Sequence, residues 1–350
     1  MNMKSNICFL ISDLEKSGGT QRMLCCLCNL LADHFNIIIM VHSKGSSFFP
    51  LDPRVEIVVL PSASGYINTN LEIYKILKNN KTKYYISLDS NSLILNGFFI
   101  PKFTKIILWE HFSIESNFRK LLFTVSRHYA VVRCKELVFL SKYEVTAWRK
   151  YNFIAKNKSE LIYNPLAIDT SDIDSSNKMH LKTFLAIGNI TNVKGFDILL
   201  DSWLTLNTDW KLRIVGLKED QLLDLKKLVD IKNIKNVELY GKVKNIQDFY
   251  KDASVFLLPS RKEATPLVLI ESQAYGLPAI VFNHLPGVLE LVNDSALIAD
   301  FEKNSESFSS EMKSIINDHL LYERLHLNAL KNADNFSLEI FKKKWLDVLI

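Results

Sequence analysis

Two glutamates in the stretch RKEATPLVLIESQAYGLPAI could bind hydroxyl groups on either side of an anion. Between them, Thr265 and Pro266 predict a helix start, because they supply an N-cap hydroxyl and a proline for the first helical position. Glu263 is then expected in the preceding loop and Glu271 on the helix. The free N–H groups of residues 265–268 would lie at the positive end of the helix dipole and form an anion site.

A diphosphate is the anion that this arrangement favours. Carboxylates on its two sides could accept hydrogen bonds from a sugar on one flank and a ribose on the other. The alternative interpretation is that Glu263 and Glu271 are surface residues around an ordinary strand–helix loop. This stretch alone leaves both interpretations open.

The elements that must position these residues follow a regular pattern, in which short apolar runs alternate with longer helix-periodic stretches. This pattern predicts parallel β/α units. Strands are expected at residues 6–11, 36–41, 55–60, 84–88, 105–109, 136–140 and 160–163, and then at 183–188, 211–216, 236–241, 254–259 and 278–282.

The length of 350 residues favours two domains over one core. We expect an α/β protein of two Rossmann-like, doubly wound domains that face each other across a cleft, with ligands at the carboxyl ends of the strands. The polar segment 164–182 is the predicted seam. It gives an N-terminal domain at 1–168, a C-terminal domain at 169–335 and an amphipathic helix at 336–350. This helix must pack on one of the two domains, and the N-terminal domain is one candidate.

Composition excludes several other classes. The net charge of +5 does not demand nucleic acid, and no zinc-finger or RNA-binding signature occurs. No apolar run reaches the roughly 18–20 residues of a membrane span, and the N-terminus lacks the features of a signal peptide. Five cysteines, an odd number, suit a reducing compartment. We therefore expect a cytoplasmic protein.

A basic and aromatic stretch at 116–158 is the strongest charge asymmetry of the chain. Lysines and arginines alternate there with phenylalanine, tyrosine and tryptophan, and only Glu136 and Glu144 oppose them. Such a surface could contact anionic lipid headgroups. The alternative is a set of ordinary solvated helix faces.

Six segments, in the right order and spread over nearly the whole chain, resemble the motifs of glycosyltransferase family 4. That family consists of retaining, sugar-nucleotide-dependent transferases of the GT-B fold. The segments are SGGTQRML, WEHFSIE, LIYNPLAID, AIGNITNVKGFDILLDSW, VELYGKVKNIQDFYKDASVFLLPS and PSRKEATPLVLIESQAYGLPAIVF.

The resemblance implies a role for each matching residue. Glu263 would hold hydroxyls of the transferred sugar, and Glu271 would hold the ribose. His111 would lie near the reacting centre, so that His111 and Glu263 are the candidate catalytic residues. The other donor-binding residues implied are Gly18, Gly19, Asn189, Lys194, Thr265, Pro266, Leu267 and Val268.

Each of these assignments has a structural alternative. Gly18 and Gly19 could form a common turn, Lys194 could be a surface lysine at a helix start, and His111 could be a structural histidine. If the resemblance holds, Lys194 meets the donor phosphates, and the two glycines let the backbone approach them because no side chain blocks it.

Three positions depart from the family pattern. Asn189 stands where the family has a phosphate-binding arginine, so Lys194 or a neighbour such as Arg261 must contribute more. Ala264 replaces a glycine, which restricts the loop, and Pro165 replaces a glycine between the domains.

The resemblance implies transfer from a uridine-diphosphate sugar to a lipid-linked oligosaccharide, in bacterial O-antigen, capsule or lipopolysaccharide synthesis at the inner face of the cytoplasmic membrane. No metal or other cofactor is expected, because amides and Lys194 neutralise the leaving diphosphate. Asp172 and Asp174 fall in the polar segment 164–182, so we interpret them as linker residues and not as a metal site. The alternatives are a nucleotide-sugar 2-epimerase and a non-catalytic subunit of a glycosylation complex.

Overall fold

The computed structural model describes residues 4–61, 65–115, 120–170, 173–189 and 191–350. The chain forms two compact units: unit 1 comprises Met1–Asn164 and Leu338–Ile350, and unit 2 comprises Pro165–Ser337. These boundaries differ by a few residues from those expected from the sequence. One reason is that the Leu166 N–H donates to the Phe336 carbonyl at 2.7 Å, which ties both ends of unit 2 together.

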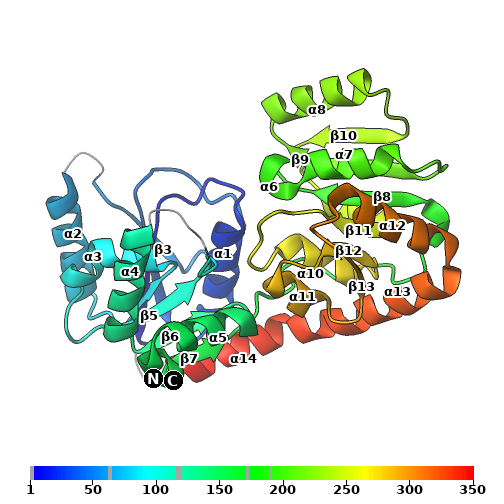
Figure 1. Cartoon of the computed structure of the whole chain (residues 1–350). Helices are drawn as coiled ribbons and strands as arrows, with labels where there is room; N and C mark the ends of the chain where they lie inside the picture. Colours follow the sequence, from blue (N-terminus) through cyan, green and yellow to red (C-terminus); the bar gives the residue numbers. More distant parts are fainter. Residues whose placement is uncertain (1–3, 62–64, 116–119, 171–172, 190) are drawn as a thin grey trace. The chain divides into compact units, whose positions relative to one another are not determined.

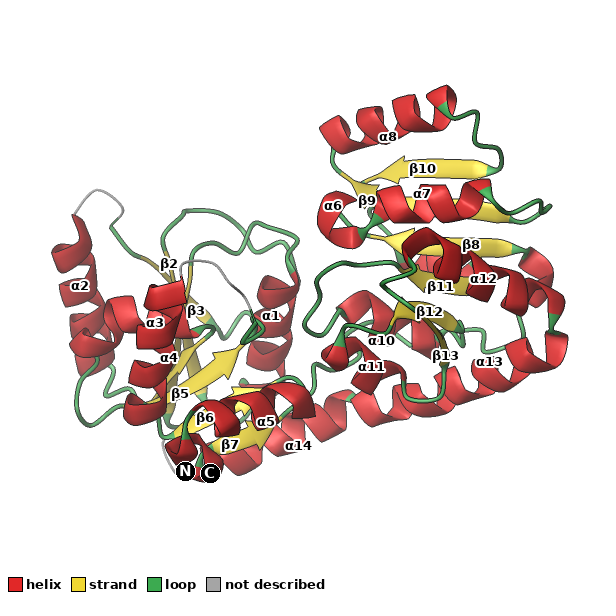
Figure 2. Cartoon of the chain, in the orientation of Figure 1, coloured by secondary structure: helices red, strands yellow, loops and turns green. Residues whose placement is uncertain are grey.

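Unit 1 contains a parallel sheet whose strand order, in the described residues, is β3-β2-β1-β4-β5-β6-β7 (Figures 1 and 2). The order reverses between β1 and β4, so their carboxyl ends form a topological switch point. The strands are β1 Asn6–Ile11, β2 Asn36–Val41, β3 Glu56–Val59, β4 Tyr84–Ser87, β5 Lys105–Glu110, β6 Glu136–Phe139 and β7 Ser159–Leu161.

Helices cover both faces of this sheet. Side chains from α2, α3, α4 and α5 build the core on one face, and α1 and α14 lie together on the other (Figure 1). Their bounds are α1 Gly19–Leu31, α2 Gly65–Asn79, α3 Ser90–Asn96, η1 Gly97–Phe99, α4 Lys120–Arg133, α5 Lys142–Tyr151, η2 Phe153–Asn157 and α14 Leu338–Leu349.

Unit 2 repeats the plan, with the order β10-β9-β8-β11-β12-β13 in the described residues and its switch point between β8 and β11. The strands are β8 Thr183–Ile187, β9 Lys211–Leu217, β10 Val237–Gly241, β11 Val255–Leu258, β12 Ala279–Phe282 and β13 Ala296–Ala299. The helices are η3 Met179–Leu181, α6 Thr191–Lys194, α7 Phe196–Leu204, α8 Glu219–Ile231, α9 Gln247–Lys251, α10 Leu267–Ala274, α11 Pro286–Val292, α12 Asn304–Asn317, α13 His319–Ala333 and η4 Asp334–Phe336.

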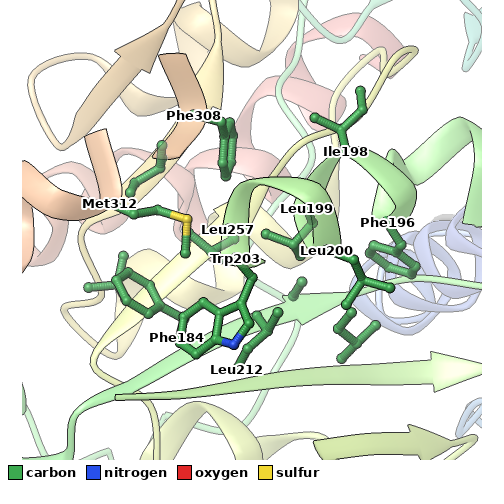
Figure 3. Packing of buried hydrophobic residues seen from close by; sticks show 14 of the residues in the cluster. Phe184, Phe196, Ile198, Leu199, Leu200, Trp203, Leu212, Leu257, Phe308 and Met312 are labelled. Atoms are coloured by element: carbon green, nitrogen blue, oxygen red, sulfur yellow. The ribbon is translucent and has the colours of Figure 1, made fainter. Parts of the chain in front are cut away.

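The core of unit 2 fixes β8 against α7 and α12. Figure 3 shows Phe184 of β8 beside Trp203 of α7, with Met312 of α12 close to both. The Phe184 ring lies 5.9 Å from that of Trp203 in an edge-to-face contact. Burial of such large rings stabilises the strand whose carboxyl end opens the switch point.

The strands expected from apolar runs are all present, and the predicted fold class is confirmed as two parallel-sheet α/β domains. One strand, β13, was not expected. Its four residues ALIA are short and only partly buried, so they lack the continuous apolar run that identifies a central strand.

The C-terminal helix α14 packs on unit 1. Its Trp345 ring lies 5.0 Å from that of Trp109 on β5, and the Tyr84 hydroxyl donates to the Leu349 carbonyl at 2.6 Å. Both tryptophans are fully buried. Helix α14 therefore completes a core that residues before 164 leave open.

Replacing Trp345 by alanine should destabilise unit 1 by about 3–5 kcal/mol, because it removes a large buried side chain and leaves a cavity beside Trp109. Urea-induced unfolding would measure the change. Lys343→Ala on the exposed side of the same helix is the matched control. A loss for Trp345→Ala no larger than that for Lys343→Ala would contradict this packing.

Candidate functional site

The candidate residues of unit 2 gather at its switch point. Residues 188–194 follow β8, and residues 259–266 follow β11, which pairs with β8 in parallel. Because parallel strands end at the same edge of the sheet, α6 in the first segment lies next to the loop after β11. The Arg261 N–H donates to the Val193 carbonyl at 2.8 Å and joins them directly.

Glycines allow this close approach. Gly195 has φ +67°, and a Cβ atom there would stand 2.0 Å from the Pro259 carbonyl oxygen. At Gly188, a Cβ atom would stand 2.6 Å from Cγ of Lys194, so the lysine stem lies over the glycine. Only glycine fits the backbone conformation and contact at position 195.

Lys194, at the end of α6, and Glu263, in the loop after β11, form an ion pair that joins Nζ to Oε1. Their side chains are only 18% and 14% exposed. The Ser260 hydroxyl donates to the same Glu263 oxygen at 3.2 Å. Partial burial strengthens this pair relative to one in water, so a cation and a hydrogen-bond acceptor are held at one place.

Glu271 lies on α10 and is almost fully buried, with 3% of its surface exposed. The Tyr250 hydroxyl donates to its Oε2 at 2.8 Å. The Tyr250 ring stacks on Tyr275, with centroids 5.3 Å apart. Burial, and to a lesser extent the charge of Glu271, raises the pKa of Tyr275 to about 12. Sequence reasoning assigned no role to Tyr250, since its contact with Glu271 joins separate elements.

The start of α10 differs from the prediction. Pro266 is the N-cap, with φ −69° and ψ 120°, and Leu267 is the first helical residue. The extended ψ of Pro266 moves the start one residue beyond the expected position, and Thr265 does not cap it. The Leu269 N–H donates to the Pro266 carbonyl at 3.2 Å, so Leu267 and Val268 carry the first N–H groups of the helix.

Asn189 is exposed after β8, and Arg261 lies in the loop after β11. Its guanidinium donates to both carboxylate oxygens of Asp197, at 2.7 and 2.6 Å. This pairing lowers the pKa of Asp197 and raises that of Arg261. The observed partner of the Arg261 guanidinium is thus Asp197, and the expectation that Lys194 or Arg261 compensates for the missing arginine stays a prediction.

The predicted glycines of unit 1 begin α1. Gly18 is the N-cap, with φ −86° and ψ 156°, and Gly19 is the first helical residue. A Cβ atom at Gly18 would meet only the flexible end of the Gln21 side chain. The backbone conformation therefore does not require glycine at position 18.

His111 follows β5, and its ring lies 4.4 Å from that of Trp109. Within the described residues, its buried Nε2 has no hydrogen-bond partner. Burial lowers the pKa of His111 to about 3. The imidazole is therefore neutral near pH 7, which suits a hydrogen-bonding role better than that of a cation.

Glu110, which sequence reasoning did not select, holds the segment that carries His111. Its Oε1 accepts from the Phe112 N–H at 3.2 Å, and its Oε2 accepts from the Ser90 N–H at 3.1 Å. Burial, followed by the charge of Asp89, raises its pKa to about 8, although both backbone donors favour the charged form. The only sequence signal was a glutamate at the end of an apolar strand.

Comparison with known proteins gives this geometry a context. Residues 169–332 match the family model "Glycosyl transferases group 1". The matched region contains Lys194, Glu263 and Glu271.

Three relatives align over nearly their whole length and ours. A Haemophilus influenzae protein named an uncharacterized glycosyltransferase is 28% identical over 97% of this chain and 99% of its own. The amylovoran biosynthesis glycosyltransferase AmsD of Erwinia amylovora is 26% identical over 97% and 98%. A Campylobacter jejuni α-1,4-N-acetyl-D-galactosaminyltransferase, whose name specifies an undecaprenol-diphosphate-linked acceptor, is 25% identical over 98% of both chains. All three homologues are thus named glycosyltransferases. The name of the second refers to synthesis of a polysaccharide, and that of the third to a lipid-linked saccharide.

The solved structure of Anabaena HepE in complex with UDP-glucose superimposes with a TM-score of 0.82 and 15% identity, over 98% of this chain and 99% of its own. The fold of the chain is GT-B, a pair of Rossmann-like domains in one polypeptide.

In the described part of the chain, no helix is long and apolar enough to cross a membrane. Among the same residues, no group of three or more histidine, cysteine, aspartate or glutamate side chains is arranged to hold a metal ion.

Glu110 should make stability fall as pH rises. The unfolded chain loses this proton near the ordinary pKa of 4.5, whereas the folded chain keeps it to about 8. Between these values the folded state binds more protons, so stability decreases with rising pH. In Glu110→Gln this contribution is absent, and the melting temperature should fall less between pH 5 and 8. Glu160→Gln, at an exposed position, is the control; parallel profiles for wild type and Glu110→Gln would refute the assignment.

Proposed function

We propose that this chain is a retaining glycosyltransferase of family 4. It transfers a sugar from a uridine-diphosphate donor to a lipid-linked oligosaccharide in bacterial O-antigen, capsule or lipopolysaccharide synthesis. The observation that carries the proposal is the Lys194–Glu263 pair, which stands at the switch point of unit 2 within the matched region. HepE, of the same fold, is described in complex with UDP-glucose.

The donor would bind where charge and hydrogen bonds are already in place. Lys194 and the N–H groups of Leu267 and Val268 would contact the diphosphate, while Glu263 and Glu271 would accept from sugar and ribose hydroxyls. Negative charge grows on the diphosphate as the anomeric bond breaks. Groups fixed beforehand stabilise that charge without reorganisation, which lowers the barrier to transfer.

Retention of configuration follows from the resemblance to family 4. The acceptor hydroxyl would attack the face from which the diphosphate leaves, and a phosphate oxygen would take its proton. His111, neutral because of its burial, would orient the donor sugar rather than act as a base. In this scheme the protein needs neither a carboxylate nucleophile nor a metal.

The donor site can be tested with two variants. Lys194→Ala and Glu263→Gln should each lower the rate of UDP release from a UDP-sugar in the presence of acceptor by about 10²–10³-fold, because each removes a preorganised contact with the donor. Lys226→Ala, an exposed lysine on α8, is the control.

Full activity of both variants at low donor concentration would contradict the site. Conversion of the donor sugar to an epimer without any acceptor would instead favour the epimerase. Donor binding with neither transfer nor conversion would favour the non-catalytic subunit.

The acceptor proposal draws on the Campylobacter relative and on the surface of unit 1. Phe153 is 83% exposed, and the large apolar side chains Leu121, Val125 and Val132 of α4 are exposed as well. Exposed lysines follow nearby in the sequence, at Lys135, Lys150 and Lys156. Arg119, part of the basic stretch, lies outside the described residues, as does Asp172. A mixed apolar and basic surface of this kind suits peripheral attachment to anionic lipid.

Attachment can be measured by pelleting with vesicles of phosphatidylglycerol and phosphatidylethanolamine. Wild type should bind at low salt and bind less at high salt, because salt screens the lysines. Phe153→Ser should weaken binding about three- to tenfold, since it removes an exposed apolar ring from the interface. Phe48→Ser, on the loop after β2 and 60% exposed, should leave binding unchanged. No binding of wild type at either salt concentration would reject membrane attachment.

A further inference from the structure

The Arg261 backbone and side chain are tethered to three separate elements. Its N–H donates to the Val193 carbonyl at 2.8 Å, and its guanidinium donates to the Asn192 carbonyl at 2.8 Å. The same guanidinium donates to both carboxylate oxygens of Asp197, in the first turn of α7. The Arg261 carbonyl lies 3.1 Å from Nε2 of His284.

These tethers connect the two segments that carry the ion pair of the candidate site. Asn192 and Val193 belong to α6, which ends at Lys194. Arg261 itself stands two residues before Glu263. Each hydrogen bond of Arg261 to α6 therefore limits how far Glu263 can move from Lys194.

His284, two residues after the end of β12, contacts the same loop. For Nε2 to donate to the Arg261 carbonyl, the ring must carry its proton on that nitrogen. The ring stacks on Phe301, with centroids 3.7 Å apart. Its other nitrogen, Nδ1, is buried and has no partner within the described residues. The stacked His284 ring thus restrains the loop that carries Glu263.

The charge of Arg261 is already neutralised. Two N–H groups contact Asp197 and a third contacts Asn192, which engages three of the five guanidinium donors. A cation with a carboxylate at 2.6 Å contributes little net field at a nearby phosphate.

We infer that Arg261 is a positioning residue: it fixes the loop bearing Glu263 against Lys194 and does not itself bind the donor phosphates. This inference rests on the proposed function, because it assumes that Glu263 contacts the donor sugar. It assigns the arginine a role different from replacing the one absent at Asn189.

A double-mutant cycle tests the inference with UDP, UDP-glucose and UDP-N-acetylglucosamine as probes in titration calorimetry. With the sugar nucleotide that wild type binds best, Arg261→Gln should weaken binding about tenfold, but less than twofold in a Glu263→Gln background, because the two residues act as one unit. Asp197→Asn should weaken binding as much as Arg261→Gln does. A variant that carries both Arg261→Gln and Asp197→Asn should bind no more weakly than either single variant.

Two controls separate positioning from loss of stability. Lys182→Gln breaks the exposed Lys182–Asp209 pair beside the amino end of β8 and should leave binding unchanged. The melting temperature of Arg261→Gln should stay close to that of Lys182→Gln, because exposed ion pairs contribute little to stability.

The outcomes are distinct. An equal loss for Arg261→Gln in both backgrounds, or unchanged binding for Asp197→Asn, would overturn the inference and favour a direct phosphate contact. If wild type binds none of the three nucleotides, the proposed function is rejected instead.

Discussion

The contact between Lys194 and Glu263 depends on a constraint of the backbone: the start of α7 approaches the end of β11 more closely than any side chain at position 195 permits. Gly195 meets this constraint with a positive φ and a bare Cα beside the Pro259 carbonyl. The lysine stem then lies over Gly188, and its ammonium reaches the carboxylate on the neighbouring loop. The two glycines therefore allow the backbone arrangement in which this ion pair forms.

A partly buried ion pair needs further support, because desolvation of two charges offsets much of their attraction. The structure supplies that support from neutral and charged neighbours. Ser260 donates to Glu263, and Arg261 and Asp197 pair with each other at the edge of the site. Glu271 accepts a hydrogen bond from the Tyr250 hydroxyl, which belongs to a different element. The carboxylates are thereby held in place, which would reduce the entropy that these side chains lose if a ligand binds them.

The sequence predicted those features that depend on local pattern. Apolar runs located the strands, and the order of motifs indicated the two-domain fold, because strand burial and turn chemistry are encoded within a few residues. Strand β13 was missed since four partly exposed residues carry too weak a pattern, and the start of α10 shifted because the extended ψ of Pro266 was not evident from residue type. The partners of Arg261, Glu110 and Glu271 could not be predicted, because they join residues from separate elements.

The return of α14 to unit 1 has a consequence for how the polypeptide folds as it leaves the ribosome. Unit 2 is continuous and can fold as soon as its last helix is made, whereas the earlier-synthesised unit 1 also needs Leu338–Ile350, which follow unit 2 in the sequence. Until then the indole of Trp109 lacks its cover, and an apolar face of the nascent sheet is open to unwanted association. Unit 1, although its first residues are synthesised before unit 2, is therefore completed only after unit 2 has been made.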